Sequence, residues 1–138
     1  MTRIDFLGTG NAFTPSGRLH ALAIIDRKIL IDTPPTLITQ LRKSGIDTSD
    51  ISHLLFTHWH ADHTFGFPFF LLERKYISDT MGQRDLNICL RPGGKKFLTN
   101  LCNLGFPGSL ENDYDLMANW NEKEVTELDG TDWKFERF

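Results

Sequence analysis

Four residues with metal-binding side chains lie within six consecutive positions of the chain, namely His58, His60, Asp62 and His63. Side chains two residues apart on extended backbone point to the same side, so the imidazoles of His58 and His60 can reach one cation. Asp62 and His63 follow where the chain is expected to enter a helix, and this change of direction presents them to a second cation alongside. Nitrogen and oxygen ligands of this kind suit zinc first, with manganese or iron as alternatives.

The alternative interpretation of this cluster is a set of unrelated polar residues at a strand end. A single histidine is more often structural than metal-bound, and we interpret His20 and His53 as structural or exposed because no motif surrounds them. Three imidazoles and a carboxylate packed together without a cation, however, leave polar groups that are costly to desolvate unless they are paired. The grouping therefore favours a metal site. Trp59, between two of the ligands, is expected to point away from the metal and to pack against a neighbouring loop.

The surrounding elements are predicted to place the cluster at the end of a buried strand. Residues 52–57 form a short apolar segment that leads directly into the histidines. The upstream pattern predicts strands over 4–7, 21–25 and 29–31, the latter two joined by a tight turn, and a helix over 34–44. The downstream pattern predicts a helix from about 63 to 76, a strand over 87–90, a helix over 95–104 and a hairpin over 124–138 that turns at Asp129-Gly130. Strands alternate with helices, which predicts an α/β fold.

Composition limits the partners that the chain can have. With 138 residues, 40% of them hydrophobic and 24% charged, the chain is predicted to be a single folded domain over residues 1–138. A net charge of −3 gives no general basic field for nucleic acid. The small group Arg91, Lys95 and Lys96 is interpreted as solvated surface, with phosphate contact at the adjacent Gly93-Gly94 turn as the lesser alternative.

Compartment and redox state follow from a few residues. Arg3 and Asp5 place charge at the start of the chain, which excludes a signal peptide. No apolar segment reaches the roughly 20 residues needed to span a bilayer. We therefore expect a cytoplasmic protein with no membrane partner. Cys89 and Cys102 are too few for a disulfide framework and are expected to be buried free thiols.

The segment from Thr57 to His63, Thr-His-Trp-His-Ala-Asp-His after an apolar strand, resembles the defining motif of metallo-β-lactamase-fold hydrolases. Residues 6–10 (Phe-Leu-Gly-Thr-Gly), the downstream Pro15 and residues 29–32 (Ile-Leu-Ile-Asp) are similar to the ribonuclease Z-like branch of these proteins.

The resemblance implies an αββα sandwich and two divalent metal ions. It assigns His58 and His60 to one metal ion, and Asp62 and His63 to the other. It also implies that Asp62 is the proton acceptor in catalysis.

Residues after the matched aspartate depart from the ribonuclease Z pattern. That pattern continues with a small residue, glycine and an acid, whereas this chain has Thr33-Pro34-Pro35. The difference weakens a specific assignment to tRNA processing. For Asp32 two roles stay open: a hydrogen-bond partner of the metal ligands, or the N-cap of the helix that follows.

No histidine follows His63 in the sequence, whereas the family takes two more histidines and a bridging aspartate from its second half. We therefore expect the chain to supply the N-terminal half of the αββα fold as a truncated chain. The alternative is a naturally shortened binding protein without catalysis. A missing second sheet leaves an apolar sheet face open, which favours self-association, for example as a homodimer.

The predicted function is metal-dependent hydrolysis of a phosphodiester bond, in RNA or in a small-molecule substrate. Two metal ions lower the pKa of a bridging water and stabilise the charge that develops on phosphorus oxygens. We expect this activity of the complete enzyme and not of the 138-residue chain by itself. The alternatives are a thioester, lactone or β-lactam hydrolase on the same fold, and a non-catalytic binding protein.

Overall fold

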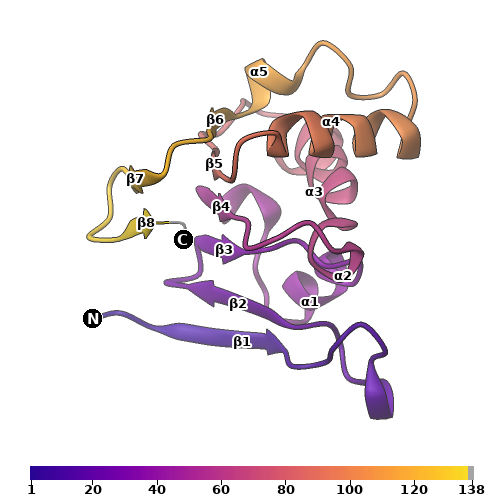
Figure 1. Ribbon diagram of the computed structural model, residues 1–138, viewed down its shortest axis with the longest axis vertical. Coiled ribbons are helices and arrows are strands. Elements are labelled where there is room, and N and C mark those ends of the chain that lie inside the picture. The colour runs from indigo at the N-terminus through magenta and orange to yellow at the C-terminus, as the bar shows by residue number, and fades with distance from the viewer. Residues whose placement is uncertain (137–138) are drawn as a thin grey trace.

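A six-stranded mixed sheet forms the centre of the computed structural model, which describes residues 1–136 (Figure 1). Its strands lie in chain order: β1 (Ile4–Gly8), β2 (Leu22–Ile25), β3 (Ile29–Ile31), β4 (His53–Leu55), β5 (Asn87–Cys89) and β6 (Asn119–Asn121). β1, β2 and β3 are antiparallel, whereas β3, β4, β5 and β6 run parallel to one another. The parallel half requires crossover connections, which the helices supply.

The turn between β2 and β3 is the tight hairpin that the sequence predicts. Asp26 and Arg27 both have positive φ, 51° and 58°, and Lys28 N donates to Ile25 O at 3.1 Å. Positive φ at both central residues is the type I′ geometry, whose twist matches that of the flanking strands.

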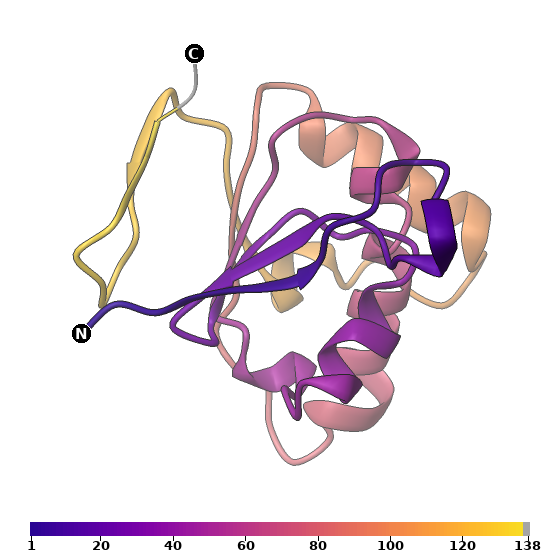
Figure 2. The same ribbon diagram turned by 90° about the horizontal axis from the view of Figure 1, so that it is seen from below.

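The helices lie together on one face of the sheet (Figure 2). They are α1 (Leu37–Lys43), α2 (Ala61–Thr64), α3 (Phe67–Glu73), the π-helical turn η3 (Arg74–Ser78), α4 (Gly94–Gly105) and α5 (Tyr114–Met117), with short 3-10 turns η1 (Pro15–Gly17) and η2 (Thr48–Asp50). Under them the sheet presents a row of side chains that are 0% exposed, namely Ile24, Leu30, Leu54 and Ile88. This continuous apolar row is the main core of the domain.

Two predicted helices differ from the structure at their ends. The helix predicted over 34–44 begins only at Leu37, after a turn in which Leu37 N donates to Pro34 O. The helix predicted from 63 to 76 is divided into α2 and α3 at Phe65-Gly66. The division has a direct cause, because Gly66 N donates to Thr33 O at 2.8 Å instead of continuing the hydrogen bonds of α2.

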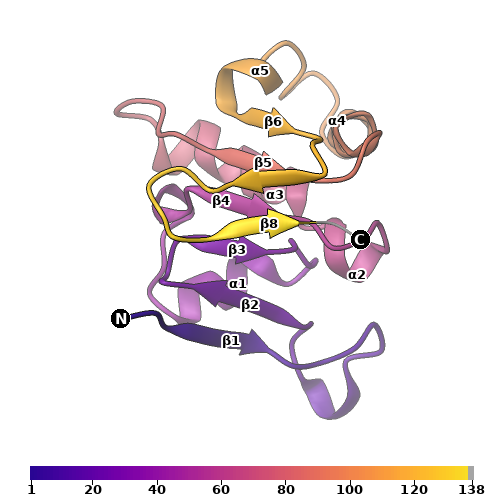
Figure 3. The ribbon, with the colours of Figure 1, turned by 60° about the vertical axis from the view of Figure 1, so that its left-hand side comes forward.

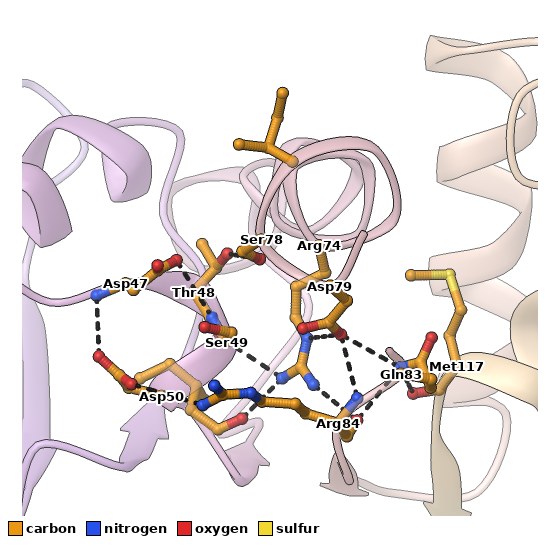
Figure 4. A network of polar contacts seen from close by, with 12 residues as sticks. Asp47, Thr48, Ser49, Asp50, Arg74, Ser78, Asp79, Gln83, Arg84 and Met117 are labelled. Atoms are coloured by element: carbon orange, nitrogen blue, oxygen red, sulfur yellow. Dashed lines mark hydrogen bonds and ion pairs between the residues drawn. The ribbon is translucent and has the colours of Figure 1, made fainter. Parts of the chain in front are cut away.

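A buried arginine ties η3 to the segment that enters β4 (Figure 4). The guanidinium of Arg74, fully buried, pairs with Asp79 at 2.8 Å. It also donates to the carbonyl oxygens of Thr48, Ile51 and Arg84 at 3.4, 2.7 and 2.7 Å. A buried guanidinium is stable only when its N–H donors are hydrogen-bonded and its charge is paired. The bonds to Thr48 and Ile51 therefore hold in place the segment that leads into β4.

The opposite face of the sheet carries a hairpin formed by β7 (Val125–Glu127) and β8 (Lys134–Glu136) (Figures 2 and 3). Its turn includes Gly130 at φ 76°, as predicted, while the last two residues of the predicted range lie outside the described residues. Leu128 packs with Ile25, Ile29 and Cys89 beneath the hairpin. The expectation of an open sheet face is therefore wrong for the part that the hairpin covers. On β1, Phe6 is 73% exposed.

Both cysteines are buried free thiols, as expected. Burial raises the pKa of Cys89 to about 11 and that of Cys102 to about 12. Thiols with such pKa values stay protonated near neutral pH and do not act as nucleophiles. Among the described helices, none combines the length and the hydropathy that crossing a membrane requires.

Candidate metal centre

The parallel pairing of β3 and β4 determines where the histidine cluster lies. Ile31 is opposite Leu55, so both strands end at the same edge of the sheet. Asp32 N donates to Leu55 O at 2.8 Å, which extends the ladder by one hydrogen bond beyond β3. Residues 57–60 continue from β4 along this edge and lead into α2, of which His60 is the N-cap. Carboxyl ends of parallel strands are the usual position of ligand sites in such sheets.

The structure places all four residues that the sequence singled out at one edge of the sheet. Of these four, only His58 and His63 belong, together with Asp32, to a group of three donors that lie within 4.8 Å of one another. The ring centroids of His58 and His60 are 4.7 Å apart, and those of His58 and His63 are 4.1 Å apart. Asp62 lies in the first turn of α2 with its Oδ2 at 3.3 Å from His63 Nε2. The rings of His58 and His60 thus lie side by side, with Asp62 and His63 beside them at the entrance to a helix.

Asp32 is the residue whose role the sequence left open, and its carboxylate is tied to the cluster. Oδ1 accepts from Thr57 N at 2.8 Å, while Oδ2 accepts from Thr57 Oγ1 at 2.6 Å and from His63 Nδ1 at 2.8 Å. The N-cap of α1 is Thr36, so Asp32 does not cap that helix. Its backbone has φ 69°, a conformation that aspartate tolerates better than most residues.

Donor atoms of Asp32, His58 and His63 lie within 4.8 Å of one another, so a cation could in principle take all three. Asp32 is only 4% exposed, however, and both of its oxygens already accept hydrogen bonds from the protein. It is therefore better suited to holding the His63 ring than to binding a metal itself. A ligating histidine characteristically donates its second ring N–H to a carboxylate in this way.

The electrostatics at His58 favour its neutral imidazole. Burial lowers the pKa of His58, and the neighbouring His63 and His60 lower it further, against the opposing charge of Asp32. Neutral imidazole is the form that binds a cation. Three imidazoles and the Asp62 carboxylate at one sheet edge are a donor set that fits zinc or another divalent transition metal.

Trp59 points away from the cluster and anchors the loop to α4. Its ring packs against Phe56 and Phe97, with centroid distances of 6.0 and 5.6 Å. At Gly94, in the first turn of α4, an added Cβ would lie 2.4 Å from Trp59 Cη2 and 2.6 Å from Leu90 Cδ1. Only glycine allows α4 to approach the tryptophan this closely.

Two N–H groups at the start of α4 already donate to a carboxylate. The carboxylate of Glu122 accepts from Gly93 N at 3.2 Å and from Lys95 N at 3.0 Å. Lys95 also pairs with Asp115. The Glu122 carboxylate therefore occupies the position that the sequence offered, as the lesser alternative, for phosphate contact.

The segment that departs from the ribonuclease Z pattern packs directly against α2. Thr33 N donates to His63 O at 2.8 Å, and Gly66 N donates to Thr33 O at 2.8 Å. A Cβ at Gly66 would lie 2.0 Å from Pro34 O, so this contact also requires glycine. The segment Thr33-Pro34-Pro35 therefore helps to hold α2, and with it His63, in place.

Comparisons with known proteins identify relatives of this chain. Residues 2–112 match the family model of the anti-Pycsar protein Apyc1. Ribonuclease Z of Lactococcus lactis subsp. cremoris is 34% identical over 113 residues, which cover 77% of this chain and 36% of that enzyme. The cGMP-dependent 3′,5′-cGMP phosphodiesterase A of Dictyostelium discoideum is 33% identical over 100 residues, covering 71% of this chain and 11% of that protein.

Solved structures show the same fold. The short form of human tRNase Z superposes with a TM-score of 0.63 at 26% identity, covering 80% of this chain and 42% of that chain. The chain spans about a third of the length of the ribonuclease Z relatives that match most of it. The predicted resemblance to metallo-β-lactamase-fold proteins of the ribonuclease Z-like kind is confirmed. Since the family model covers most of its residues, the chain belongs to the family of the anti-Pycsar protein Apyc1, a relative of ribonuclease Z within the metallo-β-lactamase fold.

Proposed function

We propose that this chain carries part of the metal site of a hydrolase that cleaves phosphodiester bonds. In the proposal His58 and His60 bind one divalent metal ion, and Asp62 and His63 bind a second. Zinc is the expected metal, with manganese or iron as alternatives. The observation that supports it most strongly is the cluster itself, in which the His63 ring is held through Nδ1 by the buried carboxylate of Asp32 at 2.8 Å.

Each residue of the cluster has a distinct part in the proposed chemistry. Metal ions held by these residues would lower the pKa of a bound water and would stabilise negative charge on the phosphorus oxygens. The Asp62 carboxylate, 21% exposed and accessible to solvent, would orient that water and accept its proton. Asp32 keeps the Nε2 atom of His63 available by occupying Nδ1. Trp59 and α4 hold the loop in place from the side away from the metal.

The choice of phosphodiester chemistry rests on the relatives and not on the ligands. The same four ligands would serve for hydrolysis of a thioester, a lactone or a β-lactam. Ribonuclease Z and the Dictyostelium phosphodiesterase, in contrast, both have names that specify phosphodiester cleavage. We therefore keep the other hydrolases as alternatives.

A 3′,5′-cyclic nucleotide is a second candidate substrate beside RNA. The similarity to the Dictyostelium cGMP phosphodiesterase favours it. The surface also favours a small substrate, because the net charge is −3 and Glu122 occupies the start of α4, where an RNA phosphate would otherwise bind. An assay that offers a cyclic nucleotide and a precursor tRNA in parallel separates the two.

We expect residues 1–138 alone to bind zinc weakly and to hydrolyse nothing. Four protein ligands shared by two metals give each metal two, fewer than the three that are typical of catalytic zinc sites. Elemental analysis, activity on a chromogenic phosphodiester and light scattering on the purified chain test this expectation. A monomer that holds two tightly bound zinc ions and turns over substrate would show it to be wrong.

The catalytic proposal is tested on the longest product that the native gene encodes. That product should cleave the chromogenic phosphodiester only when zinc is present, and a chelator should abolish the activity. If the longest product is metal-loaded but hydrolyses no phosphodiester, the phosphodiesterase proposal fails. If it holds no metal at all, the alternative of a non-catalytic binding protein replaces it.

A further inference from the structure

We propose that Thr57 is a positioning residue whose hydroxyl fixes the ring proton of His58 on Nδ1 and leaves Nε2 free to bind a metal. The hydroxyl lies between two partners: Oγ1 is 2.6 Å from Asp32 Oδ2 and 3.0 Å from His58 Nδ1. The inference rests on the proposed metal site, because the exposed nitrogen matters only if it is a ligand.

The direction of the two hydrogen bonds follows from counting protons. An ionised carboxylate can only accept, so Thr57 Oγ1 donates its single hydrogen to Asp32. The hydroxyl oxygen then has only lone pairs left to offer to His58. A hydrogen bond at 3.0 Å between that oxygen and His58 Nδ1 therefore requires the imidazole to carry its proton on Nδ1.

Asp32 fixes the proton of His63 in the same sense but without an intermediary. His63 Nδ1 donates directly to Asp32 Oδ2 at 2.8 Å. The buried carboxylate of Asp32 thus determines the tautomer of two imidazoles, that of His63 directly and that of His58 through the Thr57 hydroxyl. In free histidine the tautomer with the proton on Nε2 predominates. Without the hydrogen bond to Thr57, His58 would therefore be expected to adopt this tautomer in many molecules and to present an N–H group, instead of a lone pair, to the metal. Fixing the tautomer of a ligating histidine in this way raises metal affinity.

The role of the Thr57 hydroxyl can be tested separately from that of the rest of the residue. Its backbone N donates to Asp32 Oδ1 at 2.8 Å, and this bond persists whatever the side chain is. Thr57→Val keeps the shape of the side chain and removes the hydroxyl. Thr57→Ser keeps the hydroxyl and removes the methyl group. A purely structural role would make the two variants alike or favour valine.

The first readout needs no metal. Long-range ¹H–¹⁵N correlation spectra of the metal-free 138-residue chain, recorded above pH 8 with ¹⁵N-labelled histidine, report which nitrogen of each ring carries the proton. We expect His58 to carry it on Nδ1 in wild type and Thr57→Ser, and to shift to Nε2 in Thr57→Val. His63, held directly by Asp32, should keep its Nδ1 proton in all three and so serves as the internal control.

The second readout is zinc affinity of the same proteins, measured by competition with a chromophoric chelator. Thr57→Val should lose about 10- to 100-fold, and Thr57→Ser should stay within a few-fold of wild type. A Thr57→Val chain in which His58 keeps its Nδ1 proton, or whose His63 changes as much as His58, would overturn the inference. If His58 shifts as expected while no variant, including wild type, binds zinc, the link stands and the proposed metal site fails.

Discussion

One histidine begins strand β4 and another lies three residues beyond its end, and the two differ in a way that bears on function. His53 begins the strand and is 2% exposed; its Nδ1 contacts Ser52 Oγ at 2.9 Å, and within residues 1–136 its buried Nε2 has no hydrogen-bond partner. His58 follows the strand and lies beside two other imidazoles, linked through Thr57 to a buried carboxylate. Burial lowers the pKa of both rings.

A pKa lowered by burial therefore does not distinguish a ligand from a structural histidine. The two histidines differ in the side chains that surround each ring and in the orientation that hydrogen-bond partners give to the ring. His53 faces a cavity of about 490 Å³ whose lining includes Asn87, Asn119 and three side chains of types that can bind zinc, Cys89, Glu127 and Asp129. Among the described residues, however, no three such donors at this end lie close enough together to share a cation. The His58 end has both the donors and the carboxylate that orients them. We therefore expect metal binding only at the end that follows β4.

The largest effect is expected from His60→Ala. In a complete form of the enzyme it should abolish turnover and lower the metal content, because one metal loses a ligand and the second is disturbed. Metal stoichiometry and hydrolysis of a chromogenic phosphodiester are the measurements, with His53→Gln as the control at the other end of β4 and Trp59→Phe as a milder change nearby. Equal activity of His60→Ala and wild type at matched metal content would rule out the assigned role.

A smaller loss is expected from Asp32→Asn, which removes the acceptor shared by Thr57 and His63. Zinc affinity should fall by about 10- to 100-fold, as for other carboxylates that orient metal-binding histidines. Asp129→Asn is the matched control, because Asp129 is the carboxylate whose charge acts on His53 at the opposite end. Calorimetric titration with zinc should show a loss of affinity in Asp32→Asn and none in Asp129→Asn. An equal loss of zinc affinity in both variants would mean that the two ends of β4 do not differ in metal binding.

Gly94→Ala tests the packing that supports the loop from α4. The new Cβ would lie 2.4 Å from Trp59 Cη2, and overpacking of this kind costs about 1–3 kcal/mol of unfolding free energy. Zinc affinity should fall as well, because Trp59 lies between His58 and His60. In Gly105→Ala, at the far end of the same helix, the added methyl group meets no described atom outside its own helix within 4 Å, so it should be harmless. Urea unfolding gives the unfolding free energy of both variants, and zinc titration gives their zinc affinity. If both values were unchanged in Gly94→Ala, α4 would have no role in supporting the loop.

Sequence spacing was sufficient for the cluster and for the strand that leads into it, because both depend on neighbours in the chain. The role of Asp32 was not accessible in this way, since it requires β3 and β4 to be paired in parallel and in register. The division between α2 and α3 was missed because the apolar pattern continues across Gly66, whose N–H is taken by distant Thr33. β6 was not predicted, because Asn-Trp-Asn is shorter than the four residues over which alternation becomes a signal, and asparagine is depleted in strands.

The smallest expected effect is a change of pH dependence at the His53 end. The folded-state pKa of His53 lies below the ordinary value of 6.5, because of burial first, with Lys28 adding to it and Asp129 opposing it. Below pH 6.5 the unfolded chain therefore binds a proton that the folded chain excludes, so the unfolding free energy falls as the pH drops through this region. His53→Gln should flatten the dependence, because it removes the group whose proton binding differs between the two states. Urea midpoints at pH 5.5 and 7.5 decide, and an unchanged slope in His53→Gln would contradict the assignment.

We propose that the edge of the sheet after β4, and not the buried histidine at the start of that strand, binds the metal. Crystals of the 138-residue chain can be grown with zinc in excess, and anomalous data collected on both sides of the zinc absorption edge locate the metal. We expect the strongest anomalous peaks to lie among His58, His60, Asp62 and His63. Ordered zinc elsewhere with none at this cluster would contradict it.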